Sequence, residues 1–197
     1  MASRIEDFIN LRGEYGVGNL NSWEMEQVNE GAYVADEKIE NFTMVELFFE
    51  NETPSDSTSP IIRKCKQLTD VTKPQYLIAS VERRVDYSPI VTEELCDFYN
   101  KKGEQAGIFH IPVGKRFETS SFKMCDESGK EVTAIKNGMG AYFDPTEKKF
   151  VVVDLSKAPD NYTNSSTKLV VVANGDELAT LCSEVSTNTA AVLQNNK

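Results

Sequence analysis

Histidine is almost absent from the sequence: His110 is the single one, and this scarcity limits the chemistry open to the chain. A metal site built on histidine would need further ligands at short spacing, and no second histidine exists to supply one. Nucleophilic catalysis would need a serine or cysteine beside the imidazole and an acid behind it. We therefore expect His110 to be a half-buried strand residue that makes one hydrogen bond. We expect no catalytic residues, no metal site and no cofactor.

Cysteines are few and far apart in the sequence. The four of them, Cys65, Cys96, Cys125 and Cys182, form no C-x-x-C pair. Structural zinc sites usually take such pairs, so their absence argues against one. We expect free thiols in a reducing compartment.

Long apolar runs are also missing. Residues 1–10 include Glu6 and Asp7 and contain no apolar run of the kind found in secretory signals. No later stretch approaches the roughly 18 apolar residues that a membrane span requires. We expect a protein that is intracellular as made and has no membrane partner.

Basic residues are outnumbered by acidic ones, 21 to 31, which gives a formal net charge of −10. Contacts to phosphate need a cationic surface, so this balance disfavours binding to nucleic acid or to an anionic membrane. It favours solubility. Apolar residues make up 40% of the chain, below the usual value of about 45–50%. This deficit indicates two small cores, or a core shared with neighbouring subunits.

A glycine–lysine pair near the histidine does not form a phosphate-binding loop. Gly107 precedes Gly114 by more positions than that loop allows, and Lys115 is followed by arginine instead of serine or threonine. A turn at Gly114 with a positive φ fits better. That turn would place three charged side chains in solvent and one aromatic side chain in the core: Lys115, Arg116, Glu118 and Phe117.

Residues 1–30 predict an N-terminal arm with two short helical segments. Ser3 and Glu6 form a capping box, and the apolar residues that follow share one face at helical spacing. Helices this short need a surface to lie on. Trp23 is either a staple for the arm or an anchor in a partner interface, and the sequence favours neither. The candidate partner-binding residues are Ile5, Phe8, Ile9 and Trp23.

The rest of the chain reads as strands and turns. In residues 31–72, the stretch 42–49 is apolar at both alternating positions, which predicts a strand buried on both faces. Residues 52–60 are loop-forming, and 61–71 could be strand or helix. Residues 73–186 predict strands at roughly ten-residue spacing, with one helix over 92–103. Residues 187–197 predict a flexible tail. The fold class is mainly β: an antiparallel sandwich or barrel, as one domain or two small β subdomains.

Residues 76–185 resemble a family of small bacteriophage virion proteins, the head decoration or auxiliary capsid proteins. The similarity rests on a D-F-x-N-x-x-G-x-x-A stretch, on a G-x-x-F-x-x-[ST] stretch, and on the hydrophobic texture of the closing strands. The matching residues are Asp97, Phe98, Asn100, Gly103 and Ala106 in the first stretch, and Gly114, Phe117 and Ser120 in the second.

This resemblance implies a non-enzymatic protein of the virion, made in the cytoplasm of a host bacterium. It implies the major capsid protein as partner, and symmetric shells favour a homo-oligomer. A tail or spike component is a near alternative. A different alternative is a small β-barrel binding module or a hydrolase whose site is assembled from distant carboxylates. The candidate carboxylates are Asp97, Glu104, Glu118 and Asp144.

Overall fold

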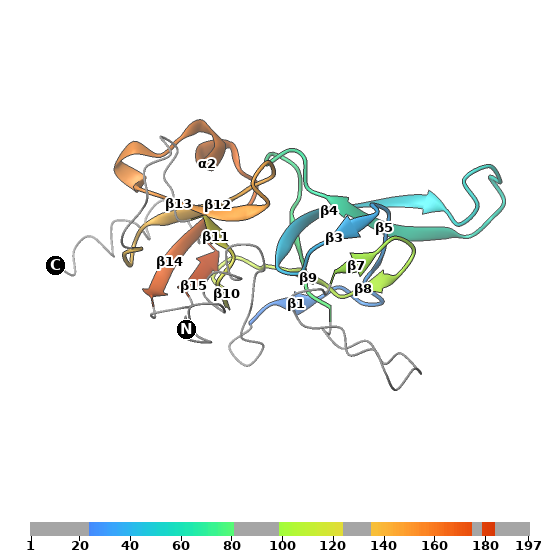
Figure 1. Cartoon of the computed structure of the whole chain (residues 1–197), viewed down its shortest axis with the longest axis horizontal. Coiled ribbons are helices and arrows are strands. Elements are labelled where there is room, and N and C mark those ends of the chain that lie inside the picture. The colour runs from blue at the N-terminus through green and yellow to red at the C-terminus, as the bar shows by residue number, and fades with distance from the viewer. Residues whose placement is uncertain (1–23, 81–98, 124–134, 175–178, 184–197) are drawn as a thin grey trace, which may run out of the picture.

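The structure is a computed structural model that describes residues 24–80, 99–123, 135–174 and 179–183. The described part is mainly β, and the predicted fold class is confirmed. It contains one seven-stranded sheet, one six-stranded sheet and one two-stranded sheet. The two larger sheets occupy opposite halves of the molecule along its longest axis (Figure 1).

The first sheet is built from residues 26–110 and has the strand order β1-β9-β6-β4-β5-β2-β8. The two-stranded sheet pairs β3 with β7 in the same half of the molecule (Figure 1). The strands are β1 (Glu26–Gln27), β2 (Ala32–Val34), β3 (Lys38–Ile39), β4 (Thr43–Asn51), β5 (Ile61–Gln67), β6 (Tyr76–Ile78), β7 (Asn100–Lys101), β8 (Gln105–Ala106) and β9 (Ile108–His110).

The second sheet comes from the C-terminal half and has the order β10-β15-β14-β12-β13-β11. A short helix, α2 (Asp160–Asn164), places Tyr162 against Tyr142, Val151 and Val153, with the 3-10 turn η3 (Leu155–Lys157) before it. The strands are β10 (Arg116–Thr119), β11 (Phe122–Lys123), β12 (Gly140–Asp144), β13 (Lys149–Val153), β14 (Leu169–Asn174) and β15 (Ala179–Ser183).

Antiparallel pairing dominates both sheets, as the sequence predicted. The exceptions among the described strands are β2 with β5 and β11 with β13, which are parallel. Parallel neighbours need a long connection, and each of these pairs has other strands between its members in the sequence. Residues 61–67, which the sequence left open between strand and helix, form β5.

One apolar core lies between the two larger sheets. Met44 and Leu77 come from the first sheet, and Phe143 and Phe150 come from the second. Phe150 is at the centre of an aromatic group, with its ring centroid 5.4 Å from that of Phe143 and 5.8 Å from that of Phe117. Because this cluster takes side chains from both sheets, each sheet covers part of the other's apolar face.

A second core belongs to the first sheet and the β3–β7 pair. It is built from small and branched side chains, namely Ala32, Val34, Ile39, Val45, Cys65, Ile78, Ala106 and Ile108. With the smaller cluster around Tyr162, the described residues form three apolar clusters instead of one large one, which agrees with the low apolar content of the sequence.

Hydrogen bonds also join the loop after β5 to the residues that follow α2. Gln75 donates from Nε2 to the carbonyl of Val71 (2.7 Å) and to Oγ of Ser165 (3.1 Å). The backbone N–H of Ser166 donates to the same Val71 carbonyl at 2.8 Å, and its hydroxyl donates to the carbonyl of Lys73. These contacts bridge the two halves beside the shared core.

The division between sheets does not follow the predicted segment boundary between residues 72 and 73. β6 and β9 lie beyond that boundary, yet they pair with each other and with β4 and β1 of the first sheet. The chain passes to the second sheet between His110 and Arg116.

The predicted N-terminal arm covers residues 1–30, of which 1–23 lie outside the described residues. Its second helical segment is wrong where it is described, because Glu26 and Gln27 form strand β1 and pair with β9. The predicted tail over 187–197 also lies outside the described residues.

The helix predicted over 92–103 is wrong at its C-terminal end. Asn100 and Lys101 form strand β7, which pairs with β3. The buried Asn100 side chain donates to the Ile39 carbonyl (3.1 Å) and to Asn41 Oδ1 (3.0 Å). These long-range bonds override the local helix pattern. Residues 92–98 lie outside the described part of the chain.

The turn before β2 yields a test of the fold. Gly31 has φ +56°, and a Cβ built on it would lie 2.0 Å from the Ala106 carbonyl oxygen. Gly103 has φ +81°, but a Cβ there would meet nothing within 4 Å. We expect Gly103→Ala to lower the free energy of unfolding by about 1 kcal/mol through backbone strain alone. Gly31→Ala should cost about 2–4 kcal/mol, because β8 must also move. Chemical denaturation measures both, and equal costs would contradict the close approach.

Candidate functional site

The β4–β5 hairpin extends beyond the strands on either side of it (Figure 1). β4 and β5 pair from Val45–Gln67 outward to Asn51–Ile61. β6 pairs with β4 only through residues 43–45, and β2 pairs with β5 only through Lys64 and Cys65. We call the projecting part, residues 46–63, the arm. It is a different segment from the predicted N-terminal arm over residues 1–30. Within the described residues, no third strand pairs with β4 beyond Val45.

The tip of the arm is held by local hydrogen bonds. Oδ1 of Asp56 accepts from the N–H (2.8 Å) and the hydroxyl (2.7 Å) of Thr58, and these bonds lower the pKa of Asp56. Asn51 donates from Nδ2 to the Asp56 carbonyl at 2.8 Å. The hydroxyl of Ser59 accepts from the Thr53 N–H at 3.1 Å and donates to the Asp56 carbonyl at 2.9 Å. The loop predicted over 52–60 is therefore an ordered turn.

One face of the arm is apolar and continues the core of the first sheet. Along β4 this face carries Val45, Leu47 and Phe49, because alternate strand residues share a face. Val45 is fully buried, Leu47 is half-buried and Phe49 is 67% exposed. Ile61 of β5 lies on the same face and is 69% exposed. The apolar stripe therefore begins in the core and ends in solvent.

This gradient corrects the prediction that residues 42–49 form a strand buried on both faces. The prediction holds for residues 42–46, which are buried, and fails for Phe49. The reason is the short length of β6 and β2, whose pairing stops before the middle of the arm.

Arg63 fixes the base of the apolar face. Its guanidinium carbon lies 5.7 Å from the centroid of the Phe49 ring, a cation–π contact. Its Nη1 donates to the carbonyls of Asn29 (2.8 Å) and Gly31 (3.3 Å) in the turn before β2. One side chain thus contacts an exposed aromatic ring and ties the arm to the body of the sheet.

The opposite face of the arm carries charged side chains beside Phe48 and Ile62. Glu50 accepts a hydrogen bond from Lys64 Nζ at 2.7 Å. Lys66 lies 5.8 Å from the centroid of the Phe48 ring and 3.8 Å from Glu46. The two faces of the arm therefore differ in that the ion pairs lie on this one and Leu47, Phe49 and Ile61 lie on the other.

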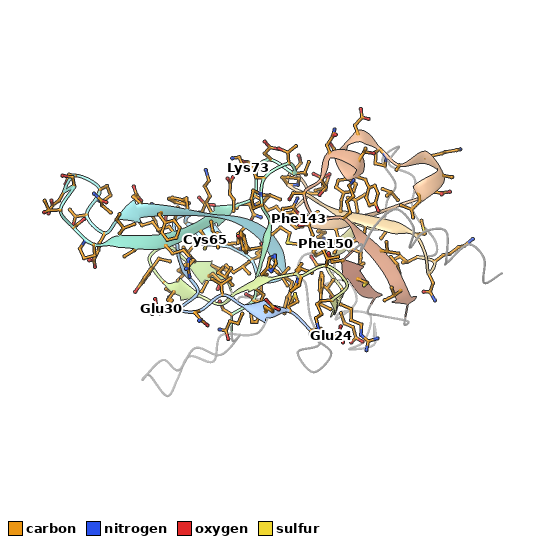
Figure 2. All side chains as sticks on the ribbon, turned by 180° about the vertical axis from the view of Figure 1, so that it is seen from behind. Glu24, Glu30, Cys65, Lys73, Phe143 and Phe150 are labelled. Atoms are coloured by element: carbon orange, nitrogen blue, oxygen red, sulfur yellow. The ribbon has the colours of Figure 1, made fainter. Side chains whose placement is uncertain are left out.

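Glu46, at the base of this face, is the centre of an ionic cluster with Lys73, Lys66 and Thr69. It is buried and accepts from Lys73 Nζ at 2.8 Å and from the Thr69 hydroxyl at 3.0 Å (Figure 2 labels Lys73). Burial by itself raises the pKa of Glu46, but the hydrogen bonds from Lys73 and Thr69 and the two lysine charges outweigh it and lower the pKa. The cluster joins the arm to the loop that contacts the second half of the molecule.

The histidine differs from its prediction. His110 is exposed, not half-buried, and its ring lies 6.1 Å from that of Tyr76. Its strand partner is Glu26 of β1, a two-residue edge strand that leaves the imidazole uncovered. Phe117 is fully buried and Gly114 has φ +83°, so the predicted turn before β10 is confirmed.

The candidate carboxylates do not lie on one element. Glu104 is in the turn between β7 and β8, Glu118 is on β10 and Asp144 ends β12. Two strands, β15 and β14, separate β10 from β12. Oε2 of Glu104 accepts from the Lys101 N–H (3.1 Å), and Oδ1 of Asp144 accepts from the Thr146 N–H (2.8 Å). Asp97 and the candidate partner-binding residues Ile5, Phe8, Ile9 and Trp23 lie outside the described residues.

The two cysteines within the described ranges are free thiols. Cys65 is buried, and this burial, with the nearby Asp36 charge, raises its pKa to about 12. Burial also raises the pKa of Cys182. Neither thiol is activated as a nucleophile.

The described part of the chain has neither a metal-binding cluster nor a membrane-spanning helix. No group of three or more His, Cys, Asp or Glu side chains there is arranged to hold a metal ion. In the same residues, no helix has the length and apolar character needed to cross a membrane.

Comparison with known proteins places the chain among proteins of prophage origin. It belongs to the family described as YonC prophage protein, whose family model matches residues 11–186. A relative from Bacillus subtilis (strain 168), the SPbeta prophage-derived uncharacterized protein YonC, is 36% identical over 179 residues. That match covers 90% of this chain and 91% of the relative. No solved structure matches the chain. The phage origin expected from the sequence is confirmed, and the role on a capsid stays a prediction.

The contribution of the ionic cluster to stability can be tested by varying the pH. Because the pKa of Glu46 is lower in the folded protein than its ordinary value of 4.5, its contribution to stability is present above that value. It is lost as the pH falls through the lower, folded-state pKa. We expect the free energy of unfolding to fall with acidification below about pH 4.5 more steeply in the wild type than in Glu46→Gln. Denaturant titrations from pH 3 to pH 7 measure this difference.

Lys73 acts at the other end of the pH scale. The hydrogen bond to Glu46 raises the pKa of Lys73 above its ordinary value of 10.5, so the contribution of Lys73 to stability is lost as the pH rises through the raised value.

Glu37→Gln provides a control for the acid titration of Glu46→Gln, since Glu37 is an exposed carboxylate that pairs with Lys102 away from the arm. If Glu46→Gln and Glu37→Gln gave the same acid profile, the cluster would not be the source of the effect.

Proposed function

We propose that this chain is a non-enzymatic structural protein of a phage particle, bound to the major capsid protein as a decoration or auxiliary protein. In this proposal the arm is the element that contacts neighbouring subunits on the shell. Repeated copies on a symmetric shell would make the protein a homo-oligomer in the assembled state. The virion is then its final location, after synthesis in the host cytoplasm.

The observation that carries the proposal is the exposed end of the apolar stripe. Phe49 and Ile61 lie on one face of a projecting arm, where solvent is in contact with about two thirds of each side chain. Large apolar side chains gathered on an exposed surface mark protein interaction sites. Their position on the arm places the contact away from the shared core, where a partner can reach it.

The arm is ordered before any partner binds. Its tip is held by the hydrogen bonds around Asp56, and its base by Arg63 and the ionic cluster. A contact surface that is already ordered loses little conformational entropy on binding, which favours docking. Preorganisation of this kind suits a protein that presents a fixed surface to a repeated lattice.

The membership of a prophage protein family and the net charge of −10 support the same role. A large net charge keeps a protein soluble and monodisperse until its partner is available. The charge is unfavourable for binding directly to packaged DNA.

The double substitution Phe49→Ser with Ile61→Ser tests the proposal. Both side chains are exposed, so we expect the free energy of unfolding to change by less than about 1 kcal/mol, including the lost cation–π contact. We expect the wild-type chain to be present in stoichiometric amounts in gradient-purified particles of the encoding phage, and the double variant to be strongly reduced there. Quantitative mass spectrometry of heads and tails, separated after disruption, gives the measurement.

Val113→Ser is the matched control, because Val113 is 63% exposed but lies in the connection between β9 and β10. It should remain on the particle. If the wild-type chain were recovered with tails alone, its partner would be a tail protein instead of the major capsid protein. Absence of the wild-type chain from all particle fractions would overturn the proposal.

A further inference from the structure

We propose that Asn137 is a site of spontaneous deamidation, and that the pairing of its turn with β14 sets the rate of the reaction. Asn137 and Gly138 form one of the two Asn-Gly pairs in the sequence. Their turn leads into β12, which pairs with β14 in the second sheet (Figure 1). The inference goes beyond the proposed function and does not depend on it, because it concerns the second sheet and not the arm.

The reaction needs water and no other reagent. The main-chain nitrogen of Gly138, after losing its proton, attacks Cγ of Asn137, and the side-chain amide leaves as ammonia. The product is a five-membered succinimide ring. Hydrolysis of its N–Cγ bond gives aspartate, and hydrolysis of its bond to the main-chain carbonyl gives isoaspartate, in which the main chain runs through the side chain. Glycine favours the attack because it has no Cβ to hinder its nitrogen.

Asn137 lies where water can reach it. Its side chain is exposed, and it occupies the second position of a turn in which the Met139 N–H donates to the Lys136 carbonyl at 3.2 Å. Hydrolysis of the ring is therefore not limited by access of water. The step that the fold can control is the attack by the Gly138 nitrogen.

The Gly138 nitrogen is hydrogen-bonded in the folded protein. Its N–H donates to the Val171 carbonyl of β14 at 2.7 Å, and the Val171 N–H donates to the Met139 carbonyl at 2.8 Å. These bonds extend the β12–β14 ladder beyond its pair Gly140–Val170. A bonded N–H cannot give its proton to solvent, so the attack requires this end of the ladder to open.

The shape of the turn opposes the reaction as well. Gly138 has φ +86°, while Asn137 is not among the non-glycine residues of the described chain that have a positive φ. This combination is typical of a type II turn, in which the residue before the glycine has ψ about +120°. At that ψ the Gly138 nitrogen is turned away from the Asn137 side chain, whereas ring closure needs it in nearly the same plane as Cβ and Cγ. Opening must therefore also rotate the peptide.

Modification of the turn would reach the packing of α2. A Cβ built on Gly140 would lie 2.7 Å from Cδ2 of Leu155 and 2.9 Å from Cε2 of Tyr162, so the main chain there fits closely beneath these side chains. Isoaspartate adds one main-chain atom before Gly138. The turn can then no longer keep both its bonds to Val171 and the position of Gly140. Each opening that ends in deamidation thus leaves a permanent change in the second sheet.

A comparison of deamidation with hydrogen exchange tests the proposal on the wild-type chain. Both reactions need the Gly138 N–H released from Val171, so both rates follow the population of the open turn. We expect Asn137 to deamidate at least about tenfold more slowly in the folded chain than in the same chain unfolded in guanidinium at the same pH. The protection of the Gly138 amide against exchange should be comparable. Mass spectrometry of digested peptides measures both and separates Asn137 from Asn174.

Met139→Ala tests local control without changing the Asn-Gly pair. The Met139 side chain packs against the shared core, and its Sδ accepts from the Lys136 N–H at 3.3 Å. Without this anchor we expect Asn137 to deamidate at least about fivefold faster than in the wild type. Met25→Ala is the matched control, because Met25 is also partly buried against the shared core but precedes β1. It should deamidate at the wild-type rate.

The outcomes decide the inference as follows. Equal rates in the folded and unfolded wild type, or an Asn137 that stays unmodified when unfolded, would overturn it. Equal acceleration by Met139→Ala and Met25→Ala would also overturn it, because deamidation would then follow unfolding of the whole chain. If Met139→Ala does not fold, the wild type still decides, since a mismatch between exchange and deamidation contradicts a shared opening. The purified isoaspartate form should unfold at lower denaturant concentration than the unmodified chain, and an equal midpoint would contradict the effect on α2.

Discussion

The packing of the two larger sheets against each other is the constraint on which the rest of the structure depends. The aromatic group around Phe150 lies in the second sheet, and Met44, Leu68 and Leu77 cover it from the first half of the chain. Burial of one Phe or Leu side chain is worth about 1.5–3 kcal/mol, so a cluster drawn from both sheets couples their stabilities. The hydrogen bonds from Gln75 and Ser166 close the side of this core. Loss of either sheet would expose the apolar face of the other.

β4 connects this core to the arm. Its first half is buried between neighbours: Met44 faces the shared core and Val45 faces the second core. Its second half leaves the body of the protein, and β5 is the one described strand beside it there. The ionic cluster around Glu46 lies where β4 passes from the buried sheet into the exposed arm. A charged side chain is tolerated there because Lys73 and Thr69 supply hydrogen bonds that offset the cost of burial. The arm is thus the extension of a strand whose position is fixed by packing.

Much of the fold could be predicted from the sequence, and the failures have physical causes. Alternation and turn residues identified the strands, the inward direction of Phe117 and the turn at Gly114, because these depend on local geometry. The sequence could not predict which strands pair with each other, because β1 pairs with β9 across more than 80 positions and β2 pairs with β5 in parallel. The helix predicted up to Gly103 failed because Asn100 makes tertiary hydrogen bonds. The arm was missed because an apolar strand looks the same in sequence whether or not its neighbours are long enough to cover it.

Exposed apolar side chains reduce the solubility of an isolated chain, so their placement is itself informative. Most large apolar residues in the described part are buried, and Phe49 and Ile61 are exceptions on one face of one projecting element. Within the described residues, β4 has strand partners on both sides up to Val45 and β5 alone beyond it. A strand that served only the internal sheet would not need a large apolar side chain at its exposed end. In the proposed function this exposure is accounted for, because a partner that covers the apolar face of the arm removes Phe49 and Ile61 from water.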